Sequence, residues 1–467
     1  MYKGMINMAL VKDMTKGRET PLLIKFMLPM LLGNVFQQFY NIADSAIVGQ
    51  HEGATALGSI GCTGSLNFLF FSLCNGLSVG AGIIVAQHFG AGNDRRVKNT
   101  VANSLYIVTL FGIFISVLGV LIARPVLTLL DTPKAQIDGA VDYMKIICGG
   151  NIAVALYNYS AQVMRALGDS KSPLIFLIVA SFINVGLDVL FVIYLGYGIK
   201  GAAWATVIAQ AVSAVASLIY GFIRNPYFRL TKENLKIDKV IVTQCVKIGM
   251  PLAAQGMLIA ISCVILQRVV NSFDEVAVSA YTVTNRIEQL VQQPYSSLGA
   301  AVSTFTGQNM GAGKQDRVRT ALKKSIMIVA AFSIIMLAVC FIFGRPIMRL
   351  FVKESNVIDI GAKGIRITSL MYFFLGTIYV TRGLLNGAGD AVYAMINGCV
   401  EVTGRICFPL LLIHLLNIGL WAIWLTTGLT WFITAMAGVI RYRQNKWCDL
   451  TVAVKEKNTE QISSDSE

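Results

Sequence analysis

Long apolar stretches, separated by short polar ones, run along almost the whole chain. An α-helix needs about 20 residues to cross a bilayer, and backbone groups in lipid must bond within their own element. Each long stretch is therefore predicted to be a membrane-spanning helix. The twelve predicted spans are 21–50, 56–88, 97–122, 139–163, 172–195, 200–223, 243–272, 278–308, 318–343, 364–385, 392–415 and 419–441.

Composition and charge agree with an all-α polytopic membrane protein. Hydrophobic residues make up 55% of the chain, charged residues only 14%, and the mean hydropathy is +0.64. The net charge of +14 gathers in loops predicted to share one side, such as 224–239 and 314–324. This positive-inside pattern places both termini in the cytoplasm of a cell-membrane protein. The basic excess is thus a topology signal, and no nucleic-acid partner is expected.

The second half of the chain repeats the first. The segment GAGIIVAQHFGAGN, from Gly80 on, recurs as TFTGQNMGAGK, with the paired residues 221 positions apart. Arg124-Pro125 recurs as Arg345-Pro346, and Gly168-Asp169 as Gly389-Asp390, at the same offset. Six spans per copy is an even number, so both copies enter the membrane from the same side. The chain is predicted to form two parallel-repeat six-helix bundles around a central cavity, an architecture that suits alternating access.

The repeat also sets the expected domains. These are a cytoplasmic N-terminal segment (1–20), an N-terminal lobe (21–223), a cytoplasmic linker (224–242), a C-terminal lobe (243–441) and a cytoplasmic tail (442–467).

The glycine-rich loops are not a nucleotide site. A phosphate-binding loop of the Walker type ends in Lys followed by Ser or Thr, whereas Lys314 is followed by Gln315. The nine cysteines form no CxxC pair, and no nucleophile triad or metal cluster is indicated. We therefore expect no enzyme activity and no cofactor. Without a nucleotide, the energy source for transport should be an ion gradient.

Polar residues inside the predicted N-terminal spans form a candidate cation site. Asp44 shares one helix face with Gln37 and Asn41, and Asp188 shares another with Asn184. By their distance along the helices, these acids, Asn184 and Thr206 lie in the same outer half of the bundle. Carboxylate, amide and hydroxyl oxygens suit a small cation, and two close acids also suit a proton carrier. The candidate cation-coupling residues are Asp44, Asn184, Asp188 and Thr206, which would also hold Na⁺ if it is the ion.

The C-terminal half carries different polar residues at the matching positions. Glu288 shares a helix face with Gln292, while Glu401 and Arg405 lie four residues apart. Glu288 is a candidate substrate or cation contact. Glu401 and Arg405 either contact substrate or pair with each other. Gln37, Asn41, Glu288, Gln292, Glu401 and Arg405 are the candidate cavity residues.

Seven motifs along the chain are characteristic of one transporter family: PMLLGNVFQQFYNIADSAIVG, GAGIIVAQHFGAGN, MRALGDSKSP, NVGLDVLFV, GAAWAT, TFTGQNMGAGK and RGLLNGAGD. Through these motifs the chain resembles the multidrug and toxic compound extrusion (MATE) family over about residues 15–445.

The resemblance implies twelve helices in two lobes and export of drugs in exchange for H⁺ or Na⁺. Asp44, fifteen residues after Pro29, matches the first-helix acid of the DinF-like branch, and Asn184, Asp188 and Thr206 match its N-lobe cation site. The NorM-like branch has an acid where this chain has Ile259, so the chain departs from that branch.

Two prolines are candidate hinges. Pro29 and its repeat partner Pro251 lie near the starts of paired spans, where proline can bend a helix. The family's first-helix proline is linked to bending on protonation, which Pro29 would reproduce.

The sequence thus predicts a monomeric antiporter for organic, cationic or amphipathic small molecules, surrounded by membrane lipid and coupled to H⁺ or Na⁺. The alternative is a flippase for lipid-linked precursors, which shares the two-lobe architecture. A flippase predicts several Arg or Lys facing a pyrophosphate, and we count few cations within the spans, among them Arg268, Arg286 and Arg405.

Overall fold

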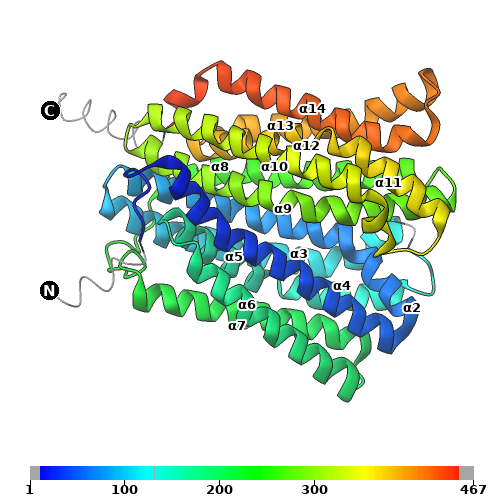
Figure 1. The fold of residues 1–467 in the computed structure, drawn as a ribbon. Helices are drawn as coiled ribbons and strands as arrows, with labels where there is room; N and C mark the ends of the chain where they lie inside the picture. Colours follow the sequence, from blue (N-terminus) through cyan, green and yellow to red (C-terminus); the bar gives the residue numbers. More distant parts are fainter. Residues whose placement is uncertain (1–10, 131, 452–467) are drawn as a thin grey trace. The chain divides into compact units, whose positions relative to one another are not determined.

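The structure is a computed structural model that describes residues 11–130 and 132–451, and most of these residues are helical (Figure 1). Within this part of the chain, every one of the twelve predicted spans coincides with a helix or with two consecutive helical segments. The fold class is therefore confirmed. The predicted N-terminal segment (1–20) and tail (442–467) lie partly outside the described residues.

The first two spans form one helical run, α2 (Glu19–Gly90), which breaks at Gly53. Gly53 has φ +82°, a backbone conformation that glycine adopts more readily than other residues. The remaining helices of the first half are α3 (Asp94–Leu129), α4 (Ile137–Gly149), α5 (Asn151–Ala166), α6 (Lys171–Asp188), the π-helical η1 (Val189–Tyr194) and α7 (Gly198–Arg224).

The second half follows the same order. Its helices are α8 (Lys239–Val270), α9 (Glu275–Gly311), α10 (Gln315–Arg349), α11 (Ser355–Ser369), α12 (Tyr372–Ala388), α13 (Ala391–Pro409), the π-helical η2 (Leu410–Leu415), the short 3₁₀ helix η3 (Gly419–Trp421), α14 (Ala422–Arg443) and the 3₁₀ helix η4 (Lys446–Asp449).

The repeat extends to the irregular features of the backbone. The α4–α5 pair is bent by 45° and its counterpart α11–α12 by 50°. The π-helical turns η1 and η2 begin 221 residues apart. Gly168 (φ +88°) and its partner Gly389 (φ +90°) both adopt the left-handed conformation that ends a helix. These shared departures from regular helix support an origin by duplication.

By internal contacts the chain divides into two compact units. Unit 1 contains Leu28–Ala253, and unit 2 contains Thr15–Met27 and the chain from Ala254 on. In unit 1, α3 packs against α4 and α5, and α7 packs against α4, α5 and α6. In unit 2, α12 packs against α9, α10 and α14. The predicted lobe and linker boundaries stay a prediction.

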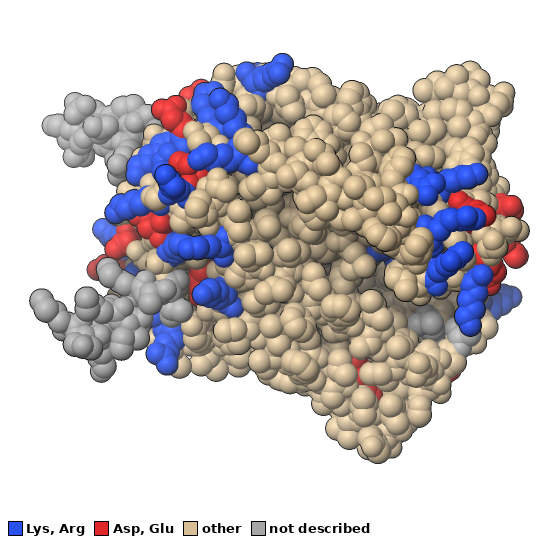
Figure 2. Space-filling model, viewed as in Figure 1, with Lys and Arg blue, Asp and Glu red and all other residues tan. Residues whose placement is uncertain are grey.

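Charged side chains are concentrated near the ends of the helices. On the face in view, Lys, Arg, Asp and Glu gather there, and the band between carries few of them (Figure 2). Nine helices of the described chain are long and apolar enough to span a membrane, and so are the two bent pairs. The 37-residue α9 is long enough but more polar. This distribution fits a protein with its helix ends in water and its middle in lipid.

The close approach of α9 and α12 depends on glycines. A Cβ atom at Gly383 would lie 2.2 Å from the carbonyl oxygen of Gly299, and one at Gly387 would lie 2.4 Å from that of Ser303. Small residues at such contacts let helix backbones pack closely in a membrane, where packing drives helix association.

We predict that Gly383→Ala destabilises unit 2, because the added methyl group must push the α9 backbone away. Overpacking of this kind costs about 1–3 kcal/mol, so the melting temperature of the purified protein in detergent should fall. The matched control is Gly64→Ala on α2, where a Cβ atom meets nothing within 4 Å. Equal melting temperatures for the two variants would contradict this account of the contact.

Candidate functional site

Four polar side chains from three helices of unit 1 approach one another. Asp44 lies on α2, Asn184 and Asp188 on α6, and Thr206 on α7. The Asn184 amide donates to the Thr206 hydroxyl at 3.4 Å, and that hydroxyl donates to the carbonyl of Ala202 at 3.1 Å. The carboxyl groups of Asp44 and Asp188 lie within electrostatic range of each other. The four candidate cation-coupling residues are therefore close together, as expected, while their role stays a prediction.

Several oxygens of this cluster are buried and have no hydrogen-bond donor. Asp188 is fully buried and Asn184 is 2% exposed. Both carboxyl oxygens of Asp188, one of Asp44 and the amide oxygen of Asn184 have no hydrogen-bond partner in the protein. Burying an ionised carboxylate without a partner is strongly unfavourable, so such a group is neutralised by a proton or a cation. This cluster has the chemistry of a site that holds one.

The backbone and two tyrosines define the surroundings of the carboxyl pair. Asp188 is the last residue of α6, and the π-helical turn Val189–Tyr194 follows it directly. Such turns within α-helical segments occur frequently at functional sites. The phenols of Tyr40 and Tyr143 lie within electrostatic range of both Asp44 and Asp188.

A small cavity lies beside the cluster. Its lining comes from α2, α6 and α7 and includes Tyr40, Ser181, Asn184, Thr206 and Gln210. These five side chains end in a hydroxyl or an amide, while Leu177, Ala180 and Ala209 make the rest of the wall apolar, so the cavity offers a few hydrogen bonds within a largely apolar wall. It therefore connects the amide and hydroxyl of the candidate cation site with further neutral polar groups.

Two residues of the expected α2 face do not join this cluster. Gln37 is half-buried and Asn41 is exposed, and the side chain of neither makes a hydrogen bond to another described residue. Their predicted place along the substrate path is therefore left open.

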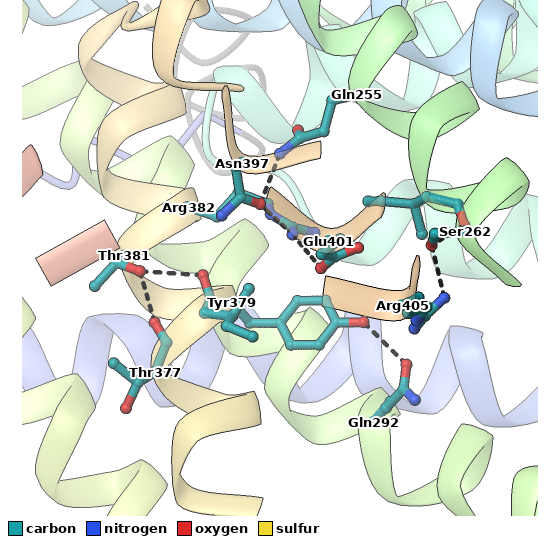
Figure 3. Close-up of polar contacts among 12 residues, drawn as sticks. Gln255, Ser262, Gln292, Thr377, Tyr379, Thr381, Arg382, Asn397, Glu401 and Arg405 are labelled. Atoms are coloured by element: carbon teal, nitrogen blue, oxygen red, sulfur yellow. Dashed lines mark hydrogen bonds and ion pairs between the residues drawn. The ribbon is translucent and has the colours of Figure 1, made fainter. Parts of the chain in front are cut away.

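The predicted alternative in which Glu401 pairs with Arg405 is wrong. Glu401 instead accepts from Arg382 of α12 at 3.0 Å, with the two side chains 8% and 15% exposed (Figure 3). Arg405 donates to the Ser262 hydroxyl at 2.7 Å and to the Cys263 sulfur at 2.9 Å. The i,i+4 spacing allowed the pair, but α8 and α12 offer each side chain a different partner.

The other two candidates of the second half lie on α9. Gln292 accepts a hydrogen bond from the Tyr379 hydroxyl at 3.1 Å (Figure 3). Glu288 is 5% exposed and has one oxygen without a partner, while its carboxyl group interacts with Thr368. Glu288 is therefore a second buried acid, in unit 2, whose function stays a prediction.

The candidate hinges lie within helices that run through them. Pro29 lies inside α2 and Pro251 inside α8. Each lies within two residues of a boundary between the two units, at Met27/Leu28 and Ala253/Ala254. This position is compatible with hinge motion, which stays a prediction.

Sequence reasoning missed Arg382, Tyr40 and Tyr143. The signal for Arg382 was present, since it opens the RGLLNGAGD motif within the predicted span 364–385. Tyr40 precedes Asp44 by one helical turn, a spacing that places both on one face. Nothing in the sequence pairs Tyr143 with Asp44, because that proximity depends on how α4 packs.

A family model and several known proteins are similar to this chain. The model of the MatE family matches the chain twice, at residues 29–190 and 251–408. These two matches cover more than half of the chain and correspond to its two repeats.

Relatives and solved structures match over nearly their full length. The chain is 27% identical to a probable multidrug resistance protein, YoeA, of Bacillus subtilis, covering 85% of the chain and 88% of that protein. It is 26% identical to another, YpnP, of the same organism, covering 93% and 97%. The structure of a MOP superfamily transporter from Pyrococcus furiosus superposes with a TM-score of 0.87 at 21% identity, covering 95% and 98%. This structural likeness shows the fold.

We predict that the energetic coupling of Glu401 is to Arg382 and not to Arg405. Removing one partner of a buried ion pair leaves an uncompensated charge, so Glu401→Gln and Arg382→Gln should each lower the melting temperature in detergent. The double variant should then lose less than the sum of the two, with a coupling of about 1 kcal/mol or more. The control is the Glu401/Arg405 cycle, which should show a smaller coupling because these two groups interact only from farther apart; coupling there and none with Arg382 would contradict the observed pairing.

Proposed function

Because the chain belongs to the MatE family of membrane transporters, we propose that it is a secondary active antiporter. It exports organic compounds, including cationic and amphipathic drugs, in exchange for H⁺ or Na⁺ by alternating access. It acts as a monomer in the cell membrane, with both termini in the cytoplasm and no cofactor besides the coupling ion. The names of the multidrug resistance relatives support this substrate class.

The observation that carries the proposal is the buried carboxyl pair Asp44–Asp188. Two acids that interact with each other, with oxygens that no protein donor reaches, favour a shared proton or a bound cation. Such an ion can leave only if the surroundings change, for example when water or substrate enters. Exchange of ion for substrate at this cluster would couple export to the ion gradient.

Each residue of the cluster has a proposed role. Asp44 and Asp188 carry the charge that the coupling ion neutralises. Asn184 and Thr206 contribute neutral oxygens, which suit Na⁺ directly and H⁺ through ordered water. This set supports assignment to the DinF-like branch. Gln37 and Asn41 extend the same α2 face as substrate contacts.

The prolines and the second-half acid complete the proposal. Pro29 allows the part of α2 that carries Asp44 to tilt when the ion binds, and Pro251 plays the same part in α8. Glu288 provides a further buried acid for a cationic substrate or a second ion.

A flippase for lipid-linked precursors is not favoured. Such a protein needs several free cations for a pyrophosphate, yet of Arg382 and Arg405 in unit 2 only Arg405 lacks an anionic partner, since Arg382 is paired with Glu401. The relatives compared above are named for multidrug resistance.

We predict that Asp44→Asn and Asp188→Asn each abolish ion-driven export, because an amide can neither bind and release a proton nor neutralise Na⁺. The measurement is ethidium transport in proteoliposomes with an imposed pH or Na⁺ gradient. The control is Asp138→Asn, an exposed acid paired with Arg124 at a helix end. Full transport by Asp44→Asn would refute the assignment of that residue.

We also predict that binding of a cationic substrate releases the ion in the absence of any gradient. Adding tetraphenylphosphonium to the protein in weakly buffered detergent solution should release protons if H⁺ is the coupling ion. If Na⁺ is the ion, Na⁺ should compete with the same ligand. Both effects should vanish in Asp188→Asn; ligand binding that neither releases H⁺ nor competes with Na⁺ would contradict coupling at this cluster.

A further inference from the structure

A set of polar side chains that form three separate hydrogen-bonded groups lies in unit 2 (Figure 3). It draws on four helices and combines two guanidinium groups, one carboxylate and several amides and hydroxyls. Its members are Gln255 and Ser262 on α8, Gln292 on α9, Tyr379 and Arg382 on α12, and Asn397, Glu401 and Arg405 on α13.

The first guanidinium, that of Arg382, is neutralised. Arg382 forms the ion pair with Glu401 at 3.0 Å and also donates to the Asn397 amide oxygen. Asn397 is held in turn by Gln255, which donates to the same oxygen at 3.1 Å, and by donating to Tyr393 at 2.9 Å. Arg382 and Glu401 therefore form a closed structural pair with no charge left over.

The second guanidinium has no anionic partner. Arg405 donates only to neutral groups, the Ser262 hydroxyl and the Cys263 thiol, and its buried Nε has no acceptor. Among the described residues no carboxylate lies within ion-pair distance of it. Glu401 and Glu288 act on Arg405 only from farther away. A guanidinium has five donors in a planar fork, so most of its capacity is unused.

The position of Arg405 in the second repeat corresponds to a residue of the candidate cation site in the first. Arg405 occupies the position 221 residues after Asn184, and Pro409 the position 221 residues after Asp188. Both positions are followed by the same π-helical turn, η1 or η2. The frame that holds a cation-binding cluster in unit 1 thus presents a positive charge in unit 2.

We propose that Arg405 binds an anionic group, a carboxylate or a phosphate, of the molecule that the protein exports. This inference rests on the proposed export function and extends it from cations to zwitterionic and anionic amphiphiles. The planar fork of a guanidinium matches a carboxylate or phosphate with two parallel hydrogen bonds. Tyr379, within electrostatic range of Arg405, holds the half-buried Gln292, whose amide is a neutral donor for the same group.

The test uses two dyes that differ only in the anionic group. Rhodamine 110 has a free carboxylate, and rhodamine 123 is its methyl ester. Their affinities for the purified full-length protein are measured by fluorescence anisotropy in detergent, without any ion gradient. Wild type should bind rhodamine 110 about tenfold or more tightly than Arg405→Gln does, since a hydrogen bond to a charged group is lost. The affinity for rhodamine 123 should change less than twofold.

Two further variants serve as controls for this binding experiment. Arg405→Lys keeps the charge but loses the fork, so it should retain part of the preference for the carboxylate. Arg286→Gln removes an exposed positive charge from α9 and should change neither affinity. The inference would be overturned by any of three results. Arg405→Gln could lower the affinity for both dyes equally, Arg286→Gln could lower the affinity for rhodamine 110 as much as Arg405→Gln does, or the wild type could fail to bind rhodamine 110.

A lipid headgroup could supply the same anionic chemistry, and nanodiscs distinguish the two sources. Phosphatidylglycerol should not weaken rhodamine 110 binding relative to phosphatidylcholine. Competition by phosphatidylglycerol that disappears in Arg405→Gln would assign the site to a lipid and overturn the substrate assignment. Because all these measurements are equilibrium binding, a failure of gradient-driven transport would contradict the antiport proposal and leave this test intact.

Discussion

One constraint shapes the polar interior of this protein: a polar group that is buried without a hydrogen-bond partner raises the free energy of the folded state. Along the helices, hydroxyl side chains meet that constraint by donating to the carbonyl one turn back, as Ser78 does to Cys74 and Thr381 to Thr377. Arg382 and Glu401 meet it by pairing. Other buried polar atoms of the described residues lack a partner, and among the acids these are both oxygens of Asp188 and one oxygen each of Asp44 and Glu288. Asp44 and Asp188 also lie within electrostatic range of each other, so a proton or a bound cation would stabilise the pair, and the proposed coupling function follows from this combination.

The duplication explains how one frame carries two chemistries. Both halves keep the bent helix pair, the π-helical turn and the left-handed glycine that ends the fifth helical segment. These features are backbone properties, so they survive changes of side chain. The side chains at the matching positions differ, with Asn184 and Asp188 in one half and Arg405 and Pro409 in the other. The same frame therefore presents an amide and a carboxylate in unit 1 and a guanidinium in unit 2.

The sequence was sufficient for the spans, the repeat and the N-terminal cluster, for a physical reason in each case. Apolar length predicts a span directly, and helical spacing placed Asn184 and Asp188 on one face. The bend at Gly150 has a sequence signal in the Gly149-Gly150 pair, whereas the bend near Leu370 has no adjacent glycine or proline and could not be predicted. The choice of Arg382 over Arg405 as partner of Glu401 depends on how α12 and α13 are rotated, which spacing within one helix cannot reveal. The proximity of Tyr143 to Asp44 and Asp188 depends in the same way on how α4 packs against other helices, which the sequence spacing cannot reveal.

Infrared difference spectroscopy can show whether the Asp44–Asp188 pair holds a proton or Na⁺, as we propose. In Na⁺-free buffer at neutral pH, we expect wild type to show the carbonyl stretching band of a protonated carboxyl group. We expect Asp188→Asn to lack this band. That band should weaken when a cationic substrate or Na⁺ displaces the proton. If wild type lacks such a band under these conditions, or if Asp188→Asn leaves it unchanged, the pair does not carry the coupling ion.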